Sequence, residues 1–182
     1  MIILIGKSGV GKDAILRQLQ KQGFNKIPTV TTRPPRSGEV DGVDYIFTDE
    51  RTFRECIDDN LFAEYRMYHA SLGDWWYGSL KSRYLISSLT DVIILTPDGY
   101  LAIKDYLKTH NISYDAFLIT ADYDIRRERI SKRGDNHVEI IRRMQSDEVD
   151  FSGLDTSEFT IVQNNDDISE AVYQILKKVM MK

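Results

Sequence analysis

Cysteine and histidine are scarce in this 182-residue sequence, which contains one cysteine and three histidines. A single cysteine, Cys56, excludes an internal disulfide bond and a cysteine-rich zinc site. The histidines lack metal-ligand spacing, so we expect no histidine-based metal centre. Long apolar runs are missing as well, because the opening run from Met1 to Ile5 stops at Gly6. We therefore expect neither a signal peptide nor a membrane span, and we predict a cytoplasmic protein.

A large excess of charge of either sign is also lacking. Twenty-eight acidic and 24 basic residues leave a formal net charge of −4, which offers no broad basic surface for nucleic acid or anionic lipid. We expect neither a nucleic-acid nor a membrane partner, and any bound phosphate has to be held locally. Apolar residues make up 42% and charged residues 29% of the chain, a mixture typical of one folded domain with a buried core.

A glycine-rich segment follows the first apolar run. The sequence from Gly6 to Lys12 matches the phosphate-binding P-loop up to its last position, and it lies between an expected strand (1–5) and an expected helix that Gly23 ends. That context favours a P-loop over a glycine turn with a surface lysine. In a P-loop, backbone N–H groups converge on phosphate oxygens and the lysine reaches the outer phosphates. The expected phosphate-binding residues are Gly6, Lys7, Ser8, Gly9, Val10, Gly11 and Lys12.

Asp13 departs from the P-loop pattern, which has Ser or Thr at this position to hold magnesium. Carboxylate oxygens also suit Mg²⁺, and a carboxylate beside a triphosphate is repulsive unless a cation lies between them. The alternative is that Asp13 only complements the helix dipole, a contribution of about 0.3 to 1 kcal/mol. We favour the metal role, because the phosphates would otherwise face an uncompensated charge.

Short unbroken apolar segments recur along the rest of the chain, at Val92–Thr96, Phe117–Thr120 and Phe159–Val162. Helical patterns such as Tyr100–Leu107 separate them. Continuous rather than alternating apolar runs favour a parallel sheet that helices cover on both faces, so we predict an α/β fold. The segment Asp167–Glu170 has the form of a capping box and predicts a final helix.

Two segments break this rhythm. Residues 31–79 carry turn signals, an alternating stretch and a concentration of aromatic residues, which predict a small mixed insert. Most of those rings are expected to pack the insert's own core, while others could form the walls of a base pocket. The second segment, 126–143, concentrates positive charge on an acidic protein. Its basic side chains are Arg126, Arg127, Arg129, Lys132, Arg133, Arg142 and Arg143, of which we expect Arg127 and Arg142 to be solvated helix residues.

A pair of arginines marks the start of the expected insert. Arg33 and Arg36 flank a stiff Pro-Pro, so their guanidinium groups can bind one phosphate from two sides, and the hydroxyl of Tyr45 can complete the set. Taken alone, the stretch would be read as a basic surface turn. Its presence beside a P-loop favours phosphate binding.

The run from Thr31 to Phe47 resembles the guanylate kinase signature almost position for position. Further segments follow in that family's order and approximate spacing, namely Phe62–Tyr65, Tyr77–Ser79, Arg129–Gly134, Arg143–Met144 and Asn165–Asp167. The resemblance covers the whole chain. It implies the P-loop nucleoside monophosphate kinase fold, with a parallel five-stranded core (1–30, 80–121 and 145–182), a monophosphate-binding insert (31–79) and an arginine-rich lid (122–144).

The resemblance also implies a reaction, the ATP-dependent phosphorylation of GMP or dGMP with Mg²⁺. The residues it places at the acceptor phosphate are Arg33, Arg36, Tyr45 and Tyr77, with Glu39 nearby. Those it places around the base are Thr29, Glu64 and Ser79. In the lid, Arg129, Arg133 and Arg143 would act with Lys12 on the transferred phosphates, while Asn165 would lie near the adenine of ATP and Asp13 at the metal.

Glu64 suits the role of base reader on chemical grounds, because a carboxylate can accept both the ring N–H and the exocyclic amino group of guanine. Ile94 and Thr96 stand where the family usually carries acidic residues. Asp98 follows the same strand and could hold the metal, although capping the next helix is the favoured role. We expect guanine selectivity looser than the family norm.

Two alternatives to guanylate kinase activity remain open. One is a P-loop kinase with another acceptor, such as a different (deoxy)nucleoside monophosphate or a phosphorylated sugar, although Glu64 argues against a sugar. The other is a catalytically inert module that binds a phosphorylated partner through Arg33, Arg36 and Tyr45. The intact P-loop lysine, Lys12, favours an enzyme. Monomer and homodimer are both compatible with the sequence.

Overall fold

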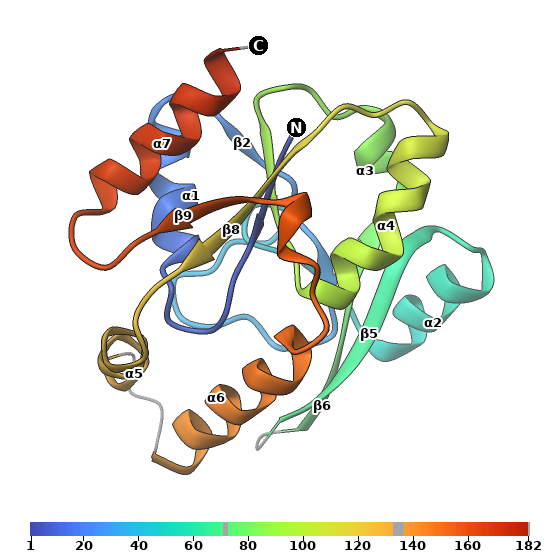
Figure 1. The fold of residues 1–182 in the computed structure, drawn as a ribbon. Coiled ribbons are helices and arrows are strands. Elements are labelled where there is room, and N and C mark those ends of the chain that lie inside the picture. Colours follow the sequence, from blue (N-terminus) through green and yellow to red (C-terminus); the bar gives the residue numbers. More distant parts are fainter. Residues whose placement is uncertain (71–72, 133–136, 182) are drawn as a thin grey trace.

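A computed structural model describes residues 1–70, 73–132 and 137–181 (Figure 1). Five strands form one sheet in the order β2-β7-β1-β8-β9, and every pair in it is parallel. Their bounds are β1 Ile2–Ile5, β2 Asn25–Lys26, β7 Asp91–Ile94, β8 Asp115–Thr120 and β9 Thr160–Gln163. The predicted five-stranded parallel core is therefore confirmed.

Helices cover both faces of this sheet, because alternate residues of the apolar strands point to opposite sides (Figure 1). Ile2 and Leu4 of β1 pack with α1 (Lys12–Lys21) and α7 (Ile168–Met180), whereas Ile3 and Ile5 pack with α3 (Lys81–Leu85) and α4 (Pro97–Thr109). All four of these β1 side chains are fully buried. This core fixes the end of β1, from which the glycine loop starts.

A second sheet has the order β4-β3-β6-β5 and is mixed, since β3 and β4 are parallel and the other pairs are antiparallel. Its elements are β3 Val30–Thr31, β4 Ile46–Phe47, β5 Phe62–Ala70 and β6 Gly73–Leu80, with α2 (Glu50–Asp58) between β4 and β5. Phe53 of α2 stacks on Phe62 of β5, with ring centroids 4.5 Å apart. These rings give the second sheet a small apolar core of its own on the side of α2.

The remaining elements are α5 (Tyr123–Ser131), α6 (His137–Phe151) and the short 3₁₀ helix Thr156–Glu158. α5 and α6 lie side by side at one end of the parallel sheet (Figure 1). In the described part of the chain, no helix is both long and apolar enough to cross a membrane.

The start of α4 differs from the sequence prediction at Thr96 and Asp98. β7 ends at Ile94, and Thr96, expected in the strand, is the N-cap of α4, where its hydroxyl oxygen accepts a hydrogen bond from the backbone N–H of Gly99 at 3.2 Å. The capping role expected for Asp98 was therefore wrong, because Asp98 pairs instead with Arg66. At α7 the cap is confirmed for Asp167, whose carboxylate accepts from the N–H of Ser169 at 2.8 Å.

Candidate active site

The glycine loop from Gly6 to Gly11 joins β1 to α1, and its shape depends on glycine. Gly9 and Gly11 adopt φ values of +81° and +96°, which favour glycine because it lacks a Cβ. A Cβ on Gly9 would lie 2.6 Å from the carbonyl oxygen of Arg126, so the loop also packs directly on the backbone of α5. The expected P-loop thus has a strand before it, a helix after it and a second helix against it.

Lys12 opens α1 and turns back over the loop. Its ammonium group donates hydrogen bonds to the carbonyl oxygens of Gly6 at 2.5 Å and Lys7 at 3.2 Å. Asn164 supports the same loop from the end of β9, because its amide donates to the carbonyl oxygen of Val10 at 2.8 Å. A phosphate bound in the loop would therefore meet a lysine that is already at the loop.

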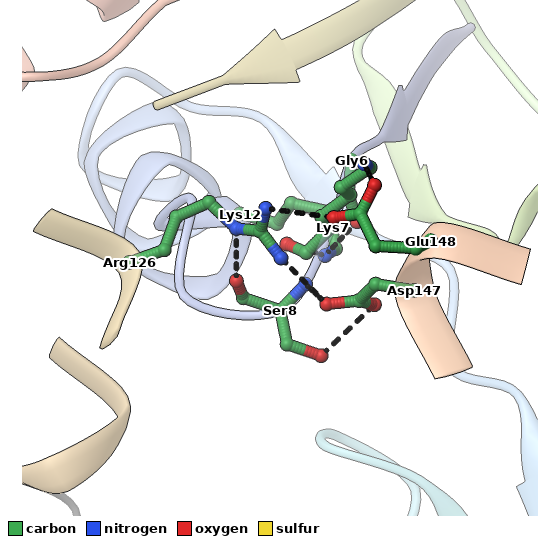
Figure 2. Close-up of polar contacts among 7 residues, drawn as sticks. All are labelled: Gly6, Lys7, Ser8, Lys12, Arg126, Asp147 and Glu148. Atoms are coloured by element: carbon green, nitrogen blue, oxygen red, sulfur yellow. Dashed lines mark hydrogen bonds and ion pairs between the residues drawn. The ribbon is translucent and has the colours of Figure 1, made fainter. Parts of the chain in front are cut away.

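Two acidic residues of α6 contact the first residues of the loop (Figure 2). Asp147 accepts hydrogen bonds from the backbone N–H of Ser8 at 2.8 Å and from its hydroxyl at 3.2 Å. Glu148 pairs with the ammonium of Lys7 at 2.5 Å. Arg126 of α5 pairs with Asp147 at 2.8 Å and approaches Glu148 at 3.7 Å. The first two residues after Gly6 are thus held by α5 and α6.

Arg33 and Arg36 meet at one carboxylate, that of Glu39. Arg33 is buried and donates to both oxygens of Glu39, at 2.8 and 2.9 Å, while the backbone N–H of Arg36 donates to the same group at 2.7 Å. Burial opposes ionisation of Glu39, but the hydrogen bonds from Arg33 and Arg36 hold its pKa below the usual range. The Glu39 carboxylate is thus bound by one guanidinium group, that of Arg33, and by the backbone of Arg36, whereas the sequence predicted two guanidinium groups on one anion.

Tyr45 contacts three side chains around the Arg33–Glu39 pair. Its ring contacts the guanidinium of Arg33 at 5.3 Å, the ring of Tyr77 at 6.1 Å and the ammonium of Lys26 at 4.8 Å. Burial, and after it the negative charge of Asp13, raises the pKa of the Tyr45 phenol to about 12. Tyr45 is therefore a hydrogen-bond donor at neutral pH, placed beside Arg33 and within electrostatic reach of Asp13 in the first turn of α1.

Glu64 and Ser79 pair across β5 and β6, where the hydroxyl of Ser79 donates to the carboxylate of Glu64. The other carboxylate oxygen faces α4, since a Cβ on Gly99 would lie 3.6 Å from it. Burial raises the pKa of Glu64 above its usual range. The carboxylate lines a cleft of about 520 Å³ together with Arg66 and Asp98. Thr29 is half-buried just before β3, and its carbonyl oxygen accepts from the N–H of Ile46 at 2.9 Å.

The expected lid arginines have protein partners. Arg129 donates to the carbonyl oxygens of Asn164 at 2.7 Å and Asn165 at 3.0 Å, which brings it beside the P-loop. Arg143 donates to Glu139 at 2.8 Å. Arg133 lies outside the described residues. The side-chain oxygen of Asn165 accepts from the N–H of Asp122 at 2.9 Å.

The two arginines expected to be solvated are both exposed. Arg142 nevertheless makes a two-pronged contact with Glu139, at 2.7 and 2.8 Å.

Asp13 is the acidic residue of the first turn of α1, is exposed, and lies close enough to Tyr45 to affect its ionisation. Asp98 is committed to Arg66, and the hydroxyl of Thr96 to the α4 cap. Across the described ranges, no three acidic, histidine or cysteine side chains gather into a metal-binding cluster. A single carboxylate still fits Mg²⁺, which binds proteins through one or two carboxylates and takes substrate phosphates and water as its other ligands.

Several residues of this region carried no usable signal in the sequence. Lys26 lies on an edge strand of two residues, and Asp147 belongs to a charged helix that reads as solvated. Arg126 was one cation in a basic run, and Asn164 precedes the expected Asn165. Only the three-dimensional structure shows that Arg126, Asp147 and Asn164 are buried against the glycine loop.

Comparisons with known proteins identify one family. The family model described as guanylate kinase matches residues 1–182. The guanylate kinase of Rickettsia prowazekii is 30% identical over 182 residues, which cover 98% of this chain and 87% of that protein. The guanylate kinase of Caldanaerobacter subterraneus subsp. tengcongensis is 32% identical over 184 residues, with coverage of 96% and 84%.

A solved structure shares the fold. The crystal structure of guanylate kinase from Anaplasma phagocytophilum superposes with a TM-score of 0.69 at 17% sequence identity, covering all of this chain and 84% of that one. Because the family model spans residues 1–182 and two curated guanylate kinases are 30% and 32% identical over nearly the whole chain, the chain belongs to the guanylate kinase family and is a nucleoside monophosphate kinase.

Proposed function

We propose that this enzyme transfers the γ-phosphoryl group of ATP to GMP and dGMP, and that Glu64 selects the guanine base. The observation that carries the choice of acceptor is the Glu64 carboxylate, held by Ser79 in the cleft between β5 and α4. Each carboxylate oxygen has two lone pairs, so Glu64 can keep Ser79 and still accept the two adjacent guanine donors. Adenine does not present that donor pair. Thr29 belongs to the same proposed base site.

The acceptor phosphate is proposed to bind at Arg33, Arg36, Tyr45 and Tyr77. In the structure Arg33 donates two hydrogen bonds to Glu39, which orient its guanidinium group. Lys26 adds a further positive charge beside Tyr45. Burial lowers the pKa of Lys26, while Asp44 and Asp13 oppose that change.

The donor triphosphate is proposed to bind the loop from Gly6 to Lys12, with Lys12 leaving its carbonyl partners for the outer phosphates. Phosphoryl transfer needs positioning and charge neutralisation more than covalent chemistry. Arg129 and Arg143 are proposed to supply further positive charge, as is Arg133. Asn165 is proposed to lie near adenine.

Asp13 is the residue proposed to hold Mg²⁺, which would neutralise charge between the donor phosphates when bound. The carboxylate sits at the end of the loop where those phosphates are proposed to lie. We further propose that the enzyme works in the cytoplasm, in purine nucleotide metabolism, without nucleic-acid or membrane partners.

A coupled assay of ADP release tests this proposal across GMP, dGMP, AMP, CMP and UMP. We expect GMP and dGMP to be used with much higher kcat/KM than the others. Equal use of several monophosphates would favour an enzyme with another acceptor. Absence of ADP release with every one of them would favour an inert phosphate-binding module.

A further inference from the structure

An ion pair is buried beneath the glycine loop, between α5 and α6. The side chain of Arg126 is 5% exposed and that of Asp147 is 12% exposed, with 2.8 Å between them. Burying two charges is costly unless their geometry is good and their remaining hydrogen-bonding groups are satisfied. The other hydrogen-bond partners of Arg126 and Asp147 therefore indicate which part of the fold the pair holds in place.

Those partners belong to one residue of the P-loop, Ser8 (Figure 2). Asp147 accepts from the Ser8 N–H at 2.8 Å and from its hydroxyl at 3.2 Å. The Nε of Arg126 donates to the Ser8 carbonyl oxygen at 3.0 Å. The N–H and the C=O of Ser8 are thus both held, which restricts the peptide planes on either side of its Cα.

The same contacts join the P-loop to the helices of the proposed lid. Gly9 packs against the backbone of Arg126, so α5 can approach the loop closely. α5 also carries Arg129, and α6 carries Arg143 four residues before Asp147. A change in the position of either helix would therefore alter the hydrogen bonds of Ser8.

We propose that Asp147 and Arg126 are positioning residues that hold the P-loop in the shape that binds the ATP phosphates, and that link this shape to α5 and α6. This inference rests on the proposed role of the loop as the ATP site. A ring of N–H groups binds phosphate strongly only when those groups already converge. Freeing the Ser8 peptide lets the loop sample other shapes, and each productive binding event then has to restore the right one.

The central test is steady-state kinetics of Asp147→Ala. We expect KM for ATP to rise about tenfold or more, since small displacements of binding groups cost large factors, while KM for GMP stays within about twofold. Asp147→Asn keeps one oxygen for the Ser8 N–H and should lie between wild type and Asp147→Ala. The matched control is Glu128→Gln, which alters an exposed carboxylate of α5 that pairs with Lys132 and should change KM for ATP by less than about twofold.

A second variant separates positioning from folding, because Asp147→Ala leaves Arg126 buried without its partner. The double variant Arg126→Met with Asp147→Leu replaces the pair by apolar side chains, which buried ion pairs often tolerate. We expect it to fold with a melting temperature near wild type and still to raise KM for ATP. Calorimetric titration of each variant with ATP checks the same change without turnover.

Unchanged ATP affinity in a folded double variant overturns the inference, as does tighter ATP binding in Asp147→Ala, which would make the carboxylate a competitor of the phosphates. An equal rise in KM for GMP would reduce the pair to a general structural role. Wild-type protein that binds no ATP would contradict the proposed function instead, so the two failures are distinguishable.

Discussion

At the scale of single residues, Lys12 and Asp13 adjoin at the start of α1 and carry opposite charges. Lys12 already bonds to two carbonyl oxygens of the loop, so its charge is at the site proposed for the donor phosphates. Lys12→Ala should lower kcat/KM by at least about 100-fold, equivalent to roughly 3 kcal/mol of transition-state stabilisation, with the fold intact. Steady-state kinetics and circular dichroism measure the two effects. A variant retaining more than about a tenth of the wild-type rate would contradict the assignment of the P-loop lysine.

Asp13 and Asp98 are the two carboxylates that the sequence offers for Mg²⁺. The structure commits Asp98 to Arg66, while Asp13 remains beside the P-loop. Asp13→Ala should therefore raise the Mg²⁺ concentration for half-maximal rate several-fold, because a carboxylate ligand is lost. Asp98→Ala is the matched control and should have the smaller effect. A magnesium titration at fixed ATP measures both, and coincident curves would leave Asp13 with only a helix-dipole role.

Glu64 has to be ionised to accept both guanine donors, and burial raises its pKa. KM for GMP should therefore rise on acidification at a pH above the ordinary glutamate value of about 4.5. Glu64→Gln offers one acceptor where two donors must be met, so the ratio of kcat/KM for GMP to that for AMP should fall by about 100-fold. The pH dependence of KM should be lost as well.

Arg36→Ala is the control for this experiment. Its proposed contact is the phosphate that all acceptors share, so it should weaken GMP and AMP alike and leave their ratio unchanged. A wild-type ratio near one, or an equal fall in both variants, would contradict the base-reading role of Glu64.

At the scale of elements, the sequence predicted the helices and strands whose residue pattern lies within one short segment of the chain. The buried run of β1, the glycine loop and α1 follow from apolar continuity, a positive-φ requirement and a helical period within 23 residues. β7 was predicted too long because Thr96 looks like a strand residue, whereas its hydroxyl caps α4.

The long hairpin of β5 and β6 was not visible as two strands. Aromatic rings pack on the α2 side of β5, and the other side carries Glu64, Arg66 and Tyr68 together with rings from β6. Neither face is purely apolar or purely polar, so the period of two that marks a half-buried strand is blurred. Polar side chains that line the candidate site therefore prevented the sequence pattern from identifying these two strands.

α6 shows the same limit for charged residues. Glu139 and Asp147 are eight positions apart on its buried face, yet acidic residues on a helix normally face solvent. The partners of Glu139 are Arg142 and Arg143, three and four positions further along the same helix. The partners of Asp147 are Arg126 and Ser8, which come from other segments and meet it only in the folded structure. Part of the site was predicted because the family signature is contiguous, and the rest was not because its contacts join distant segments.

At the scale of the whole molecule, half-buried Glu64 and buried Glu139 affect the pH dependence of stability with opposite signs. The folded state raises the pKa of Glu64, so its ionisation at neutral pH opposes folding and protonation relieves that cost. Glu139 behaves in the opposite way. Hydrogen bonds from Arg142, and after them from Arg143, outweigh burial and lower the pKa of Glu139 to about 2. Ionised Glu139 therefore stabilises the fold.

The Glu139 contribution should be fully present above pH of about 4.5, its ordinary value, and should be lost as the pH falls from there to about 2. Glu139→Gln should lower the free energy of unfolding by about 1–3 kcal/mol at pH 7, and the difference from wild type should shrink to near zero by about pH 2. Urea unfolding of both proteins at a series of pH values measures this difference. Arg142→Gln should show a smaller loss over the same pH window, because Arg143 still donates to Glu139. A difference between wild type and Glu139→Gln that stays constant with pH would mean that the side chain stabilises α6 by packing and not by its charge.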